Sequence, residues 1–133
     1  MKNGPAPMQS LRFHYIFDAL GIREAKLADA ALVERLLREL AELCGMRILS
    51  GPHVAHGVPE NPGISGFCII DYSHISIHTF SETGEIYADI FSCKPYDPER
   101  VRRHLMVALG ADGGRVTFFR VEYPLRGPSA VNF

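Results

Sequence analysis

Apolar side chains recur every three or four positions between residues 30 and 44, which predicts an amphipathic helix with one buried face. The positions concerned are Leu32, Val33, Leu36, Leu37, Leu40 and Leu43. Asp29 precedes this helix as a candidate N-cap, and Gly45 follows it as a C-terminal stop. A second helix is predicted from Pro98, with Asp97 as its cap and a buried stripe of Val101, Leu105, Ala108 and Leu109.

The rest of the chain shows the short apolar runs and two-residue alternation that are typical of strands. Strands are predicted over residues 11–17, 46–50, 66–70, 74–80, 86–93 and 115–123. The segment 51–63 is rich in proline and glycine and contains His53 and His56, so it is predicted to be a long loop. A turn over 81–84 would fold 74–80 and 86–93 into an antiparallel hairpin.

This hairpin predicts a contact between residues that are distant in the sequence. If the turn is centred near Glu82 and Thr83, residues whose numbers sum to about 165 lie opposite each other. Cys93 then lies opposite Tyr72 and Ser73. These two residues are predicted to interrupt the extended structure just before the first hairpin strand.

Together the elements predict an α+β fold, a two-layer sandwich of an antiparallel β-sheet with two helices on one face. Without the short strand 46–50, the order along the chain is β-α-β-β-β-α-β. One face of the sheet remains uncovered in this arrangement, so we expect self-association through that face or through an edge.

Composition narrows the class of protein. A chain of 133 residues with 47% hydrophobic and 22% charged residues suits one soluble domain, 1–133, in which 1–9 and 124–133 are expected to be tails. A net charge of −1 without a long basic run argues against nucleic-acid binding. No apolar run approaches the ~20 residues of a membrane span, and the N-terminus lacks a secretory pattern, so a cytoplasmic location is expected.

The three cysteines predict neither a disulfide framework nor a zinc module, because their number is odd and their spacing is unpaired. Cys44 and Cys68 lie in apolar segments and are expected to be buried. Cys93 stands at a strand end, beside Lys94 and Pro95, and is expected to be exposed.

Candidate chemistry is concentrated in one stretch, Tyr72-Ser73-His74-Ile75-Ser76-Ile77-His78-Thr79-Phe80-Ser81-Glu82, followed by Cys93. A structural strand would carry mainly apolar and charged residues. Here hydroxyl and imidazole side chains occupy many of the positions, and these side chains transfer protons and attack acyl groups.

This stretch resembles the core motif of the prokaryotic S-adenosylmethionine decarboxylases, pyruvoyl enzymes that make their own cofactor by self-cleavage. The matching positions, without gaps, are Ser73, His74, Ile77, His78, Thr79, Phe80, Glu82, Asp89, Phe91 and Cys93. An upstream element of the family fits Gly63-Ile64-Ser65-Gly66. There are two departures: Tyr72 stands where the family usually has Glu, and Ser81 where it usually has Pro.

The resemblance implies roles for these residues. The chain would be cleaved between Tyr72 and Ser73, and Ser73 would become the pyruvoyl group that forms a Schiff base with the substrate. His78 would transfer a proton during cleavage, with assistance from Ser65, and Cys93 would be the proton donor of the decarboxylation.

The resemblance also implies a substrate site and an assembly. Glu82 would hydrogen-bond the ribose of the nucleoside. Phe80 is assigned to the same site, although a place in the core is the simpler interpretation, and His74 has no separate role. The implied protein is a homodimer of processed protomers that supplies the aminopropyl donor for polyamine (spermidine) synthesis.

Two alternatives remain open on the residues alone. A relative with the same cofactor could decarboxylate arginine or ornithine, which the changes at Tyr72 and Ser81 would allow. An unprocessed, non-catalytic homologue could act as a binding or regulatory subunit. A metal site is not expected, because His74 and His78 would be roughly 13 Å apart on a strand and no carboxylate or cysteine cluster completes a ligand set.

Overall fold

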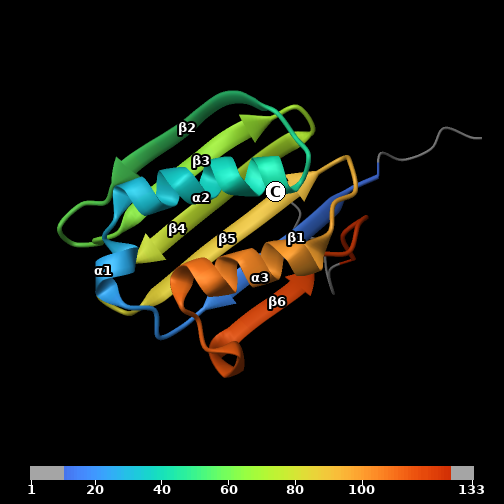
Figure 1. The fold of residues 1–133 in the computed structure, drawn as a ribbon. Coiled ribbons are helices and arrows are strands. Elements are labelled where there is room, and N and C mark those ends of the chain that lie inside the picture. The colour runs from blue at the N-terminus through green and yellow to red at the C-terminus, as the bar shows by residue number, and fades with distance from the viewer. Residues whose placement is uncertain (1–10, 127–133) are drawn as a thin grey trace, which may run out of the picture.

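The computed structural model describes residues 11–126, which form one six-stranded sheet with helices on one side (Figure 1). The strands are β1 (Phe13–Ala19), β2 (Ile48–His56), β3 (Ile64–Ile70), β4 (Ser73–Phe80), β5 (Glu85–Ser92) and β6 (Val116–Arg120). Their order in the sheet is β2-β3-β4-β5-β1-β6, and every neighbouring pair is antiparallel. The helices are α1 (Glu24–Leu27), α2 (Ala30–Leu43) and α3 (Pro98–Leu109), and a 3₁₀ turn, Gly113–Arg115, precedes β6.

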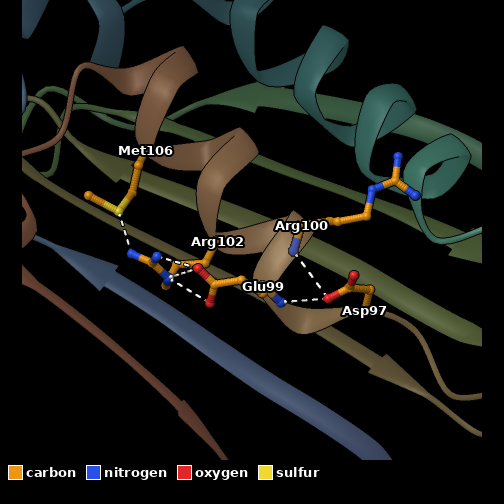
Figure 2. A network of polar contacts seen from close by, with 5 residues as sticks. All are labelled: Asp97, Glu99, Arg100, Arg102 and Met106. Atoms are coloured by element: carbon orange, nitrogen blue, oxygen red, sulfur yellow. Dashed lines mark hydrogen bonds and ion pairs between the residues drawn. The ribbon is translucent and has the colours of Figure 1, made fainter.

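Both long helices begin at aspartate caps, as their sequences predict. The Asp29 side chain accepts a hydrogen bond from the backbone N–H of Leu32, at 3.2 Å. At the start of α3, the Asp97 carboxylate accepts from two backbone N–H groups, those of Glu99 and Arg100 (Figure 2). Figure 2 also shows Arg102 of α3 bound to Glu99, one turn earlier, which reinforces the exposed side of the helix.

The core lies between the helices and one face of the sheet. Burial alternates strictly along β3, and the central strands β4 and β5 place isoleucines on the same side. The buried faces of α2 and α3 pack onto this layer with Leu36, Leu37, Leu40, Val101, Leu105 and Leu109. The fold is therefore the predicted α+β two-layer sandwich.

The opposite face of the sheet carries no helix among the described residues, as Figure 1 shows. We call it the open face. It presents His74, Ser76, His78 and Phe80 of β4, and the partners of these residues on β3 and β5. Four large apolar side chains on it are substantially exposed: Phe67, Ile69, Phe80 and Phe119.

Three details differ from the sequence predictions. Residues 51–56 are not loop but continue the predicted strand 46–50, and together they form the edge strand β2. Four strands therefore lie between α2 and α3, where the predicted order β-α-β-β-β-α-β has three. An edge strand tolerates Pro52, because one side of its backbone needs no partner, and two register shifts accommodate the irregular segment. The short helix α1, which sequence analysis does not predict, bridges β1 and α2.

The predicted tail 1–9 and most of the predicted tail 124–133 lie outside the described residues. No helix within residues 11–126 has both the length and the apolar character that crossing a membrane requires.

Candidate active site

The β4–β5 hairpin brings Ser73 and Cys93 together. Ser73 pairs with Ser92 and Phe80 with Glu85, so the opposed residue numbers sum to 165 as predicted. One step beyond the ladder, the Cys93 backbone N–H donates to the Tyr72 carbonyl oxygen at 3.0 Å. The Ser73 Oγ and the Cys93 Sγ lie 3.7 Å apart. The prediction that a distant cysteine arrives beside the serine is confirmed.

The backbone at Ser73 has an unusual conformation. Its φ of 145° is the one positive value for a non-glycine residue in the described chain, 11–126. A side chain with a Cβ is strained there, and such strain is found where a backbone is held for a chemical purpose. Ser73 follows a two-residue turn and is half-buried, so its peptide bond with Tyr72 is held at the mouth of the hairpin.

A second pair of polar residues, Ser65 and His78, lies on the neighbouring strands β3 and β4. The two residues are opposite each other in the ladder, and the Ser65 Oγ lies 2.9 Å from the His78 Nδ1. They line a cavity of about 420 Å³ on the open face, together with His53, Val54, Ala55, Gly66 and Phe67. The two residues to which the family resemblance assigns proton transfer during cleavage are therefore within hydrogen-bonding distance of each other.

The two pairs are not in contact with each other within one chain. His78 lies five positions beyond Ser73 on the extended strand β4, and five residues of strand span roughly 16 Å. Glu82 is farther still, in the exposed turn after β4. Phe80 is 37% exposed on the open face, so its interpretation as a core residue is wrong.

Between the two pairs, the open face carries a polar network centred on Asp89, which sequence analysis matches to the family motif but gives no role. The Asp89 carboxylate is buried, lies 2.7 Å from the His14 Nε2 and accepts from the Ser76 hydroxyl. The His14 Nδ1 contacts the Tyr123 hydroxyl at 2.9 Å. Burial, and then the nearby Asp89 carboxylate, raises the pKa of Tyr87 to about 12.

Aromatic rings connect this network to the Ser73 end of the sheet. His74 stacks on Phe91, with ring centroids 5.6 Å apart. The edge of the Tyr123 ring meets Phe91 at 5.8 Å. His74, which has no assigned role, is thus part of the packing on the open face. The roles of Asp89 and His14 could not be found from the sequence, because their contacts join strands that are distant along the chain.

The cysteines divide as predicted into two buried residues and one exposed residue. Burial raises the pKa of Cys44 to about 12 and that of Cys68 to about 11, which keeps both as neutral thiols. Cys93 alone of the three offers an accessible thiol at the hairpin mouth.

Comparison with known proteins identifies the class to which this fold belongs. The crystal structure of the adenosylmethionine decarboxylase from Aquifex aeolicus superimposes with a TM-score of 0.72, over 94% of this chain and 100% of that one, at 23% sequence identity. At this identity the likeness concerns the fold.

Sequence comparison reaches the family itself. The family model described as S-adenosylmethionine decarboxylase matches residues 13–121. An S-adenosylmethionine decarboxylase proenzyme from a Synechococcus strain is 31% identical over 84% of this chain and 85% of its own length. A proenzyme of the same name from Clostridium botulinum is 34% identical over 70% of this chain and 78% of its own length. The chain belongs to the S-adenosylmethionine decarboxylase family.

Proposed function

We propose that this protein is a self-cleaving decarboxylase that acts on S-adenosylmethionine and supplies the aminopropyl donor for polyamine synthesis. One observation carries the proposal: Ser73 stands on a strained backbone, with the carbonyl of the preceding residue hydrogen-bonded and the thiol of Cys93 at 3.7 Å. Family membership supplies the reaction class, and the names of the relatives supply the substrate.

Self-cleavage begins at the peptide bond between Tyr72 and Ser73. The Ser73 hydroxyl attacks the Tyr72 carbonyl carbon, the C–N bond breaks, and the acyl group moves from nitrogen to oxygen. The Cys93 N–H, which donates to that carbonyl oxygen, would stabilise the negative charge that develops on it. The Tyr72 side chain takes no part in this step, so cleavage does not require the glutamate that is usual at this position.

The ester is then opened by elimination. A base removes the Ser73 α-proton, and the Oγ departs with the Tyr72 acyl group as a carboxylate. The dehydroalanine that remains takes up water, loses ammonia and leaves a pyruvoyl group at the new N-terminus. His78, whose Nδ1 lies within hydrogen-bonding distance of the Ser65 Oγ, is our candidate base, because a neutral imidazole nitrogen accepts a proton readily.

This base must come from a second copy of the chain, because roughly 16 Å separates His78 from Ser73 within one copy. We therefore place the two open faces against each other in a homodimer. A two-fold axis near Ser76 would run the facing β4 strands in opposite directions, so that Ser73 of one copy meets His78 of the other. The exposed side chains of Phe67 and Ile69 would be buried in this interface.

Once formed, the pyruvoyl group would supply an electron-withdrawing carbonyl for the loss of carbon dioxide from the bound substrate. Cys93 would return a proton to the substrate carbon, since its accessible thiol lies beside position 73. Glu82 of the second copy would come to the same site and would accept hydrogen bonds from the ribose diol, with Phe80 beside it.

Intact-mass analysis of the purified protein, alongside a Ser73→Ala control, tests the proposal. Two fragments that separate between Tyr72 and Ser73, with the second blocked to Edman sequencing, are the expected result. A single chain that remains uncleaved after prolonged incubation, as the control does, would overturn the proposal and favour a non-catalytic homologue. Thermal shifts with S-adenosylmethionine, arginine and ornithine then identify the substrate.

A further inference from the structure

Lys94 places a cationic group at the cleavage junction, where the reaction described above assigns it no role. Its ammonium nitrogen lies 5.3 Å from the centroid of the Tyr72 ring. The same ammonium donates to the Gly45 carbonyl oxygen at 3.2 Å. Both of these partners are uncharged, and the lysine side chain is half-buried. A cation is thus held beside Tyr72 by groups that leave its charge uncompensated.

Self-cleavage creates an anion at the same place. When the Ser73 Oγ departs, the former peptide carbonyl of Tyr72 becomes a carboxylate, and residue 72 becomes a chain terminus. Before cleavage this carbonyl oxygen is held by the N–H of Cys93, the residue directly before Lys94. The new negative charge therefore arises next to the residue that carries the ammonium.

We propose that Lys94 binds the α-carboxylate that self-cleavage creates at Tyr72, and so keeps the end of the N-terminal fragment docked in the processed protein. The inference rests on the proposed self-cleavage and adds a binding site to it. The identity of residue 72 agrees with this role. A glutamate there would offer its own carboxylate to the ammonium before cleavage, whereas the tyrosine ring attracts the cation and leaves its charge available.

A purely structural role for Lys94 makes a different prediction. Gly45 lies just beyond the C-terminus of α2, and a lysine that donates to a carbonyl there stabilises the end of the helix. That contribution is the same whether or not the chain is cleaved. The two roles can therefore be separated by measuring the effect of a Lys94 substitution in both forms of the protein.

The experiment compares Lys94→Met in the fully cleaved protein and in the uncleavable Ser73→Ala protein, with unfolding temperatures measured at equal concentration. We expect the substitution to lower Tm by about 4 °C more in the cleaved form, which corresponds to the loss of one favourable ion pair. Lys94→Arg should retain most of the difference, because it keeps the charge. Lys26→Met is the matched control, since Lys26 also donates to a carbonyl oxygen, that of Ala108 at 2.8 Å, and should lower Tm equally in both forms.

Equal losses for Lys94→Met in the two forms would overturn the inference and leave the helix-end role. It would also be overturned if Lys94→Met in the Ser73→Ala background weakened S-adenosylmethionine binding but not methylthioadenosine binding, because Lys94 would then serve the substrate carboxylate. Neither result affects the proposed function, which fails only if the unsubstituted chain is not cleaved.

Discussion

At the scale of single residues, Asp89 is the side chain that connects neighbouring strands on the open face. Its carboxylate is buried between strands and is bound by His14 from β1 and Ser76 from β4, so it ties three strands together on the side that carries no helix. Removal of a buried carboxylate leaves its partners without an acceptor, and that desolvation cost exceeds the value of the contact itself.

We therefore expect Asp89→Ala to lower the free energy of unfolding by about 3 kcal/mol. Ser76→Ala removes one donor only and should cost about 1 kcal/mol. Urea denaturation of the two variants in the Ser73→Ala background, where every chain has the same covalent structure, measures both values. Equal effects of the two substitutions would show that the carboxylate is not the centre of the network.

The thiols give a second prediction at this scale. At pH 7.5 a thiol reagent should modify Cys93 rapidly in the folded protein and should spare Cys44 and Cys68, whose thiols are buried and whose pKa values are raised. Mass mapping of the modified peptides measures this. Labelling of all three residues at similar rates would contradict the burial of the two core thiols.

The buried thiol of Cys44 also predicts how the stability of the folded protein changes with pH. The folded protein holds the Cys44 proton with a pKa of about 12, against an ordinary value of 9.0. The stabilising effect of the neutral buried thiol is thus complete below about pH 9 and is lost as the pH rises toward 12. Stability measured across this window should fall, and Cys44→Ala should reduce the slope.

At the scale of elements, Thr79 joins three segments that are far apart in the sequence. Its buried hydroxyl donates to the Leu27 carbonyl of α1 at 2.6 Å and accepts from the Ile64 N–H at the start of β3. Gly63 packs against the same strand so closely that a Cβ at that position would lie 1.9 Å from the Thr79 carbonyl oxygen. Thr79 therefore holds the C-terminal end of β4 in place, next to Phe80 and the turn that contains Glu82.

Thr79→Val should cost about 2–4 kcal/mol, because it keeps the shape of the side chain but leaves a buried carbonyl and a buried N–H unsatisfied. Thr83→Val is the matched control, since the Thr83 hydroxyl is exposed and makes only a 3.5 Å contact with the Phe80 carbonyl. Chemical denaturation of both variants measures the difference. A Thr79 variant as stable as the Thr83 variant would contradict this role.

Elements could be predicted where local signals agreed. The spacing of apolar residues and the aspartate caps gave α2 and α3, and the turn at 81–84 fixed the register of the β4–β5 hairpin. The strand over residues 51–56 was not predicted, because glycine and proline at positions 51 and 52 are typical of loops. That segment pairs only with β3, because β2 lies at the edge of the sheet. Proline is tolerated in an edge strand, but the local sequence does not show which strand will lie at the edge.

At the scale of the whole molecule, the open face should be the dimer interface. Ile69→Lys places a charge on a half-exposed position of that face and should convert the protein to monomer with loss of self-cleavage. Val107→Lys is the control, because Val107 is 82% exposed on the helical side. Light scattering after size exclusion gives the mass, and denaturing gels give the extent of cleavage. A monomer that is still cleaved would contradict a site in which Ser73 of one copy meets His78 of the other.

Complementation gives a stricter test of the same arrangement. Neither Ser73→Ala nor His78→Ala should be cleaved alone. A refolded equal mixture should contain dimers in which Ser73 of one chain meets His78 of the other, so about half of the His78→Ala chains should be cleaved. No cleavage in mixtures that are shown to contain heterodimers would place both residues in one chain's site, against the geometry found here.

The sequence by itself determined the family, the class of fold, the two helices with their caps and the pairing of Ser73 with Cys93. These depend on short-range periodicity, turn chemistry and a motif with fixed spacing, all of which are local properties. The tertiary structure decided the rest: the cavity that Ser65 and His78 line, the network around Asp89, and the position of Lys94 beside Tyr72. Each of these depends on which strands become neighbours and which face of the sheet the helices cover, and burial of the apolar faces settles both only when the whole chain folds.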